Sequence, residues 1–226
     1  QIMKNIKARL KSLLEKQLAD WDLGFIESVS DQIDRGYKLS KKQLDTISKI
    51  ENKHSPEALK KRRDWEEQWD SDNKREIAKI CAQYYYEKRE YYYKLSKDIL
   101  NKDAYIPTEK QFKALTANKY AKKILDATFA EPKYKVGSLV CVRKTCGADA
   151  YADLWSLRKL EGKPALITAV NSQPVLSAAV GAKVYSVLPF GSGTLYYIEE
   201  RNIKKYKENK KKKRSAQDGS QNELLL

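Results

Sequence analysis

Apolar residues recur at every third or fourth position through the first half of the chain, which is the period of helices with one buried face. The first such stripe consists of Ile2, Ile6, Leu10, Leu13 and Leu14. Residues 2–14 are therefore predicted to form an amphipathic helix. A basic amphipathic helix can also lie on a membrane surface, but packing against the following helices is the favoured interpretation.

The next two apolar segments predict a second and a third helix. The second helix has its apolar face at Phe25, Ile26, Val29 and Ile33. It is predicted to end at Arg35 and Gly36, because glycine readily adopts the left-handed conformation that follows a helix. Ser40 and Gln43 have the spacing of a capping box, so a third helix is predicted to begin there and to bury Leu44, Ile47 and Ile50.

A similar pattern returns about halfway along the chain. Thr108 and Gln111 form a second potential capping box, followed by apolar Phe112 and Leu115. The two blocks align as Tyr-x-x-Ser/Thr-x-x-Gln-apolar-x-x-apolar. They predict a two-fold helical-hairpin repeat, although chance similarity between two short blocks is the alternative.

Residues 56–103 lie between the blocks and are predicted to form a long helical region with tyrosine triplets at 84–86 and 91–93. A spacing of seven places the triplets nearly above one another on a helix. Tyr85, Tyr92 and Arg89 are candidates for stacking on bases or positioning them, and packing within the helical domain is the alternative. Trp65 and Trp69 are predicted to share one helical face.

From Pro132 onward the helical spacing gives way to short β-branched and aromatic runs separated by Gly, Pro, Asn and Ser. These runs predict four or five strands, at residues 134–143, 164–170, 182–188 and 194–200. The residues after Arg143 are predicted to form a long loop or short helix. The sequence thus predicts an α+β protein with an α-helical domain over 1–130, a small β-barrel over 132–207 and a tail over 208–226.

Charge points to a class of partner. The chain of 226 residues has a formal net charge of +15, and residues 204–214 hold eight Lys or Arg residues against Glu208, a net +7. Residues 208–226 have few apolar side chains, so a disordered tail is predicted. A basic balance of this kind favours polyanionic partners through counterion release, and solubility is the alternative role.

The residue types present give little support for catalysis. No glycine-rich phosphate loop occurs, and the single histidine, His54, lies in a polar stretch. Cys81, Cys141 and Cys146 do not form zinc-ligand spacings with it. A buried strand thiol and a loop thiol in a reducing compartment are favoured over a redox pair of Cys141 and Cys146. We therefore expect no catalytic residue, metal site, cofactor or small-molecule substrate.

The hydropathy of the sequence indicates in which cellular compartment the protein is expected. No segment approaches the roughly 20 apolar residues that span a bilayer. Residues 1–14 also carry no apolar run of the signal-peptide type. A reduced, cytoplasmic protein without a membrane partner is expected.

The β region resembles small SH3-like barrels of the KOW kind over about 70 residues. The marks are Val136-Gly137 before an alternating strand and Gly162-Lys163 before the next, with Ser138 where an acidic residue is more usual. Such barrels bind RNA, DNA, ribosomal or polymerase subunits, or peptides, so the resemblance implies a binding function without choosing among them.

The basic residues of this region are candidates for nucleic-acid contacts. Those in or beside the long loop are Arg143, Lys144, Arg158, Lys159 and Lys163. Those in the tail are Lys210, Lys211, Lys212, Lys213 and Arg214. We expect a non-enzymatic accessory protein that binds DNA or RNA in replication, transcription or repair, and a merely solvated loop is the alternative origin of the loop charges.

Two further interpretations stay open. Gln221, Leu224 and Leu225 resemble the short peptides with which replication and repair proteins bind the bacterial sliding clamp. This implies an adaptor that docks on a clamp, polymerase or ribosome.

The overall combination resembles accessory proteins of tailed-phage replication or transcription. A metal-dependent nuclease is the weaker alternative and would use Asp64, Glu66, Glu67, Asp70 and Asp72.

Overall fold

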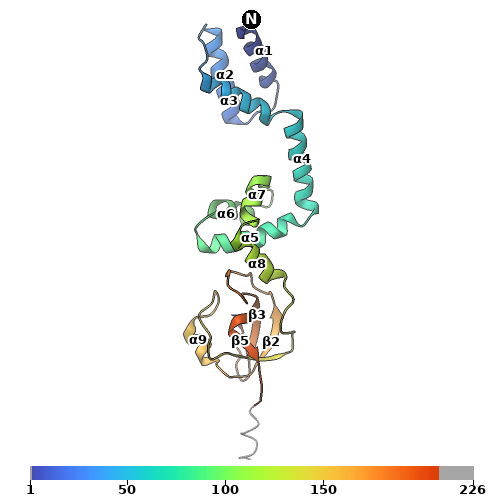
Figure 1. The fold of residues 1–226 in the computed structure, drawn as a ribbon, viewed down its shortest axis with the longest axis vertical. Helices are drawn as coiled ribbons and strands as arrows, with labels where there is room; N and C mark the ends of the chain where they lie inside the picture. Colours follow the sequence, from blue (N-terminus) through green and yellow to red (C-terminus); the bar gives the residue numbers. More distant parts are fainter. Residues whose placement is uncertain (1, 209–226) are drawn as a thin grey trace, which may run out of the picture. The chain divides into compact units, whose positions relative to one another are not determined.

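The computed structural model describes residues 2–208 and shows an α+β protein, as predicted (Figure 1). The chain divides into two compact units, Gln1–Asp72 and Asn73–Leu226. Within the described residues, the first unit is helical and the second combines helices with an antiparallel sheet. The candidate site lies in the second unit.

The described part of the first unit contains α1 (Ile2–Leu14), α2 (Asp20–Asp34), α3 (Lys41–Lys53) and α4 (Pro56–Ser71). The apolar stripes of α1, α2 and α3 meet in one core, which consists of Ile6, Leu10, Leu13, Ile26, Val29, Ile33, Ile47 and Ile50. Burial of each large side chain contributes roughly 1.5–3 kcal/mol. Leu14, which was predicted to join the stripe, is exposed at the end of α1. Trp65 and Trp69 share a face of α4, with ring centroids 6.3 Å apart.

Local hydrogen bonds confirm the predicted helix ends. Gly36 adopts a φ of +85°, and its N–H donates to the Ile33 carbonyl. At the start of α3, the Gln43 N–H donates to Ser40 Oγ at 3.3 Å, and the Ser40 N–H donates to Gln43 Oε1 at 2.8 Å. Each of these contacts joins residues three positions apart, so sequence alone was sufficient to find them.

The helical part of the second unit consists of α5 (Lys74–Lys88), α6 (Tyr93–Asn101), α7 (Glu109–Thr116) and α8 (Lys119–Phe129). The second capping box is also confirmed. Gln111 N–H donates to Thr108 Oγ1 at 3.2 Å, and Thr108 N–H donates to Gln111 Oε1 at 2.8 Å. In both units, therefore, a capping box begins the helix that follows a helical hairpin.

The prediction of a continuous helix through both tyrosine triplets is wrong. Arg89 and Tyr92 adopt left-handed backbone conformations, with φ of 54° and 61°, and they separate α5 from α6. The triplets still meet, but across a helical hairpin. Tyr92 packs edge-on against Tyr85, with ring centroids 5.1 Å apart, and Tyr93 stacks on Tyr86 at 5.3 Å.

The sheet contains β1 (Leu139–Val142), β2 (Ala165–Val170), β3 (Val184–Pro189), β4 (Tyr196–Glu199) and β5 (Ile203–Lys205). Their order is β4-β3-β2-β1-β5, and all pairs are antiparallel. A short helix, α9 (Leu154–Lys159), lies between β1 and β2, and a 3₁₀ turn, η1 (Glu200–Asn202), joins β4 to β5. Among the described strands β4 and β5 are opposite edges of an open sheet, so the predicted closed barrel is not confirmed.

Alternate residues of the strands bury one face of this sheet. The core consists of Val140, Val142, Cys146, Ala152, Leu157, Leu160, Ala165, Ile167, Tyr185, Val187, Ile198 and Ile203. Strand register brings Ile167 opposite Val187, which places facing apolar side chains within contact distance. The segment between β1 and β2 contributes Leu157 and Leu160 to this core, so it is packed against the sheet.

Helices and sheet share a second core within this unit. Ile124 of α8 packs with Val175 and Ala182, which belong to the segment between β2 and β3. The Lys183 ammonium donates to the Thr128 carbonyl at 2.9 Å, near the end of α8. These contacts cross the domain boundary predicted near residues 130–132, which lies within the second compact unit. The predicted domains themselves stay a prediction.

Candidate nucleic-acid interface

The site is built on α9, which the structure holds firmly on the sheet. Asp153 caps the helix, because its carboxylate accepts from the Ser156 N–H at 2.9 Å and from the Ser156 hydroxyl at 2.8 Å. These hydrogen bonds hold the pKa of Asp153 below its usual value. The side chains of Leu157 and Leu160 extend from the inner face of α9 and are buried in the sheet core.

Trp155 lies on the opposite face of α9 and is 67% exposed. Successive helical residues are about 100° apart, so Trp155 cannot share the inward direction of Leu157 and Leu160. The Lys159 ammonium lies over the indole, 3.0 Å from the ring centroid. α9 thus presents an aromatic ring and a cation together at the surface, which is a combination suited to stacking and charge contacts.

The two candidate arginines have partners within the protein. Arg143 is half-buried, and its Nε donates to the Ile203 carbonyl at 2.8 Å, which ties β1 to β5. Arg158 is exposed and forms an ion pair with Glu161 at 3.3 Å. Arg143 is therefore partly structural, and the charge of Arg158 is partly compensated.

The three candidate lysines, Lys144, Lys159 and Lys163, are all exposed. The chain returns to the end of β1 after α9, where the Gly162 N–H donates to the Val142 carbonyl at 3.2 Å. This hydrogen bond brings the backbone near Lys163 alongside the backbone near Lys144. Three lysines that are up to 19 positions apart thus belong to one loop anchored at both ends.

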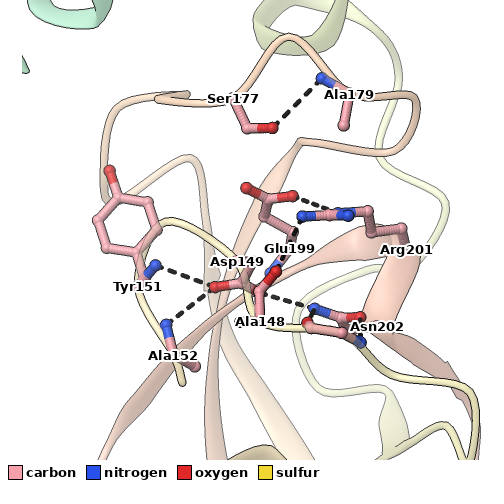
Figure 2. A network of polar contacts seen from close by, with 10 residues as sticks. Ala148, Asp149, Tyr151, Ala152, Ser177, Ala179, Glu199, Arg201 and Asn202 are labelled. Atoms are coloured by element: carbon pink, nitrogen blue, oxygen red, sulfur yellow. Dashed lines mark hydrogen bonds and ion pairs between the residues drawn. The ribbon is translucent and has the colours of Figure 1, made fainter. Parts of the chain in front are cut away.

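A buried polar network fixes the segment between β1 and α9 (Figure 2). One oxygen of Asp149 accepts from the Tyr151 and Ala152 N–H groups, each at 2.9 Å. The other oxygen accepts from the Glu199 N–H at 3.0 Å and from Asn202 Nδ2 at 2.9 Å. A single carboxylate therefore joins the loop to the turn between β4 and β5.

An ion pair between a buried glutamate and an exposed arginine lies next to this carboxylate. Arg201 Nε donates to Glu199 Oε2 at 2.6 Å, and the Glu199 side chain is only 1% exposed. Figure 2 shows the two groups side by side. Burial raises the pKa of Glu199, and the Arg201 guanidinium opposes the rise by stabilising the charged form. The arginine also donates to the Ala148 carbonyl at 3.3 Å, so the pair belongs to the same loop anchor.

Tyr151 connects this loop to β4 and to the segment between β2 and β3. Its hydroxyl donates to the Pro174 carbonyl, and its ring packs edge-on against Tyr197. Burial raises the pKa of Tyr151, and the negative charges of Glu199 and Glu87 raise it further. Glu87 belongs to the last turn of α5. Val175, next to Pro174, packs in the cluster that also contains Ile80 and Tyr84 of α5, so the loop and α5 are neighbours in the second unit.

The tyrosine hairpin presents a different set of rings from the one predicted. Tyr85 is buried, and its hydroxyl donates to Asn118 Oδ1 at 2.7 Å, so its role as a stacking group is corrected to a structural one. Arg89 and Tyr92 are exposed, although the Tyr92 ring leans on Tyr85. Tyr91, which is not among the predicted site residues, is 77% exposed at the turn.

Sequence reasoning also missed Trp155. The usable signal was Asp153 and Ser156 at capping distance, followed by Leu157 and Leu160 three positions apart. This pattern defines a short helix with an inward face, and Trp155 lies off that face.

The basic tail and the peptide-like segment lie outside the described residues. These are Lys210, Lys211, Lys212, Lys213 and Arg214, and also Gln221, Leu224 and Leu225. Their roles stay predictions. The described chain leads toward them through exposed Lys204, Lys205 and Lys207.

Within residues 2–208, the helices lack the combination of length and apolar character needed to cross a lipid bilayer. No protein-family model, curated protein or solved structure matches this chain. The geometry around α9 is therefore the basis for assigning a function.

Proposed function

We propose that this chain is a non-enzymatic accessory protein that binds nucleic acid in replication, transcription or repair. The observation that carries the proposal is the exposed indole of Trp155 with the Lys159 ammonium above it. Phosphates attract the lysines through counterion release, and the indole offers a stacking surface. A merely solvated loop would account for the lysines, but it gives no reason for an ammonium held over an exposed indole.

The strand order supports an SH3-like architecture for the sheet. β1 to β4 form an antiparallel meander, β5 returns to pair with β1, and a 3₁₀ turn lies between β4 and β5 in the chain. This is the strand order of SH3-like barrels. Gly137 and Gly162, two of the sequence marks, both have positive φ at the turns that lead into β1 and β2. We propose an open member of that class, with the long β1–β2 segment as its binding element.

The tail contributes charge in this proposal. Lys210 to Arg214 follow the exposed lysines of β5 by only a few residues. Each additional phosphate contact steepens the fall of affinity with salt by about 0.9 in a log–log plot. Truncation after Lys207 should therefore flatten the salt dependence while α9 still binds.

The test compares two triple variants that have the same loss of charge. K144Q/K159Q/K163Q removes the α9 lysines, and K41Q/K42Q/K49Q removes three exposed lysines of α3 in the first unit. Fluorescence anisotropy with labelled DNA and RNA at two salt concentrations gives affinity and salt slope. We expect the α9 variant to lose about two to three units of slope and the α3 variant to lose little. Equal losses, or no binding by the intact chain at low salt, would contradict the proposal.

A further inference from the structure

The faces of bases are accessible only in some nucleic acids. In a duplex each base is covered by its neighbours, and a protein reaches base edges and phosphates. An exposed indole can stack on a base only if that base is unpaired. Lysines alone would serve a duplex, because its phosphates carry the higher charge density. Trp155 therefore distinguishes between these ligands, whereas the lysines around it do not.

A second exposed ring lies in the same unit. Tyr91 is 77% exposed at the turn between α5 and α6. The neighbouring tyrosines pack against one another across the turn: Tyr92 packs on Tyr85, and Tyr93 stacks on Tyr86. The ring of Tyr91 projects beyond this packed set, next to Tyr92.

Backbone strain accompanies this turn. Arg89 and Tyr92 both have positive φ, which bulky side chains adopt at an energetic cost and glycine does not. A glycine at either position would form the same turn with less strain. Strained residues of this kind cluster where a side chain is needed for binding, and here they hold a cation and a ring on either side of Glu90 and Tyr91.

The turn and the α9 loop belong to neighbouring parts of the unit. The Tyr151 hydroxyl of the β1–β2 loop donates to the carbonyl of Pro174, in the segment between β2 and β3. Helix α5 contributes Tyr84 to the apolar cluster that contains Val175. Both exposed rings thus extend from segments that are packed in place.

We propose that the partner is single-stranded nucleic acid, with one base stacked on Trp155 and another on Tyr91. Lys159 then neutralises a phosphate beside the first base, and Arg89 does so beside the second. This inference rests on the proposed function and narrows it to one strand state. DNA and RNA offer the same stacking chemistry, so both are included in the test.

The experiment measures the affinity of the intact chain for a labelled single strand of about 16 nucleotides, within the range of known site sizes, and for the matching duplex. We expect Trp155→Ala to weaken single-strand binding roughly 5-fold to 150-fold and to leave duplex binding within about 2-fold. Tyr91→Ala should have an effect of the same kind. The two losses should multiply in the double variant, because the rings do not touch.

Exposed aromatic residues of the first unit supply the controls. Trp21 is 67% exposed and Tyr37 is 63% exposed, so Trp21→Ala and Tyr37→Ala remove matching surface without touching either ring. Both should bind like the unmodified chain. Trp155→Phe, which keeps an aromatic face, should retain most of the affinity, and this checks that the loss with alanine is not misfolding.

The outcomes separate the inference from the proposed function. Equal loss of single-strand and duplex affinity in Trp155→Ala, or no loss of either, overturns the inference but leaves nucleic-acid binding in place. No binding of the intact chain to DNA or RNA in any form overturns both. Single-strand binding that depends on Trp155 but not on Tyr91 overturns the second contact.

Discussion

At the scale of single residues, buried polar groups fix the shape of the β1–β2 loop. Asp149 satisfies four donors, and Glu199 lies buried beside Arg201. A buried carboxylate without its counter-charge is costly, because burial favours the neutral form. The loop that presents Trp155 therefore depends on an ion pair at the end of β4.

This dependence should appear as a pH effect in Arg201→Met. Burial raises the pKa of Glu199 in the folded state, so folded protein binds the proton more tightly and stability falls as pH rises through that pKa. Loss of the guanidinium raises this pKa further. We expect the variant to lose about 1–3 kcal/mol of unfolding free energy at pH 7 and much less near pH 4.

Urea unfolding at both pH values checks this expectation. The double variant E199Q/R201M serves as the control, because its side chain at position 199 does not titrate. The contribution of this pair to the difference in unfolding free energy between the double variant and the unmodified chain should be nearly the same at pH 4 and pH 7. A loss in Arg201→Met that is the same at both pH values would show that Glu199 is not the group involved.

At the scale of elements, sequence predicted what short-range chemistry decides. The capping boxes at Ser40 and Thr108 were found with both partners, since each spans three residues. The break between α5 and α6 was not found, because the turn contains no Gly, Pro or Asn and instead uses Arg89 and Tyr92 in left-handed conformations. The residues after Arg143 predict either a loop or a short helix, so they do not determine the exposure of Trp155.

The cap of α9 offers a test at this scale. Asp153→Ala removes the acceptor for Ser156, whereas Asp153→Asn keeps a capping side chain, and both remove one negative charge. We expect alanine to cost about 1 kcal/mol of unfolding free energy and asparagine to cost little. Nucleic-acid affinity should be lower with alanine than with asparagine, since the orientation of Trp155 depends on the helix. Identical behaviour of the two variants would exclude that role.

At the scale of the whole molecule, the α+β class was predicted correctly, whereas the predicted domain boundary stays a prediction. The apolar period changes near Pro132, whereas the second compact unit begins at Asn73. The reason is the shared core of Ile124, Val175 and Ala182. Contacts between residues that are about 50 positions apart have no signature in local periodicity. Sheet closure is likewise a long-range property, and the sheet is open.

Fragments test where the second unit begins. A chain of residues 132–208 lacks α8 and exposes Val175 and Ala182, and Lys183 loses its acceptor at Thr128. We expect it to be less stable than residues 73–208 by about 2–5 kcal/mol, comparable to removing one large buried side chain. Urea unfolding followed by circular dichroism measures the difference. Equal stability of the two fragments would place the boundary near residue 132 instead.

The open sheet has a consequence for how the protein behaves at high concentration. Each free edge of a sheet is a template on which a strand of another molecule can add, and this is a common route to aggregation. Here β5 is three residues long and carries exposed Lys204 and Lys205. On β4, Asp149 already accepts the outward N–H of Glu199. The lysine charges protect the β5 edge, and the Asp149 carboxylate covers part of the β4 edge. We therefore expect the sheet to resist the addition of strands from other molecules.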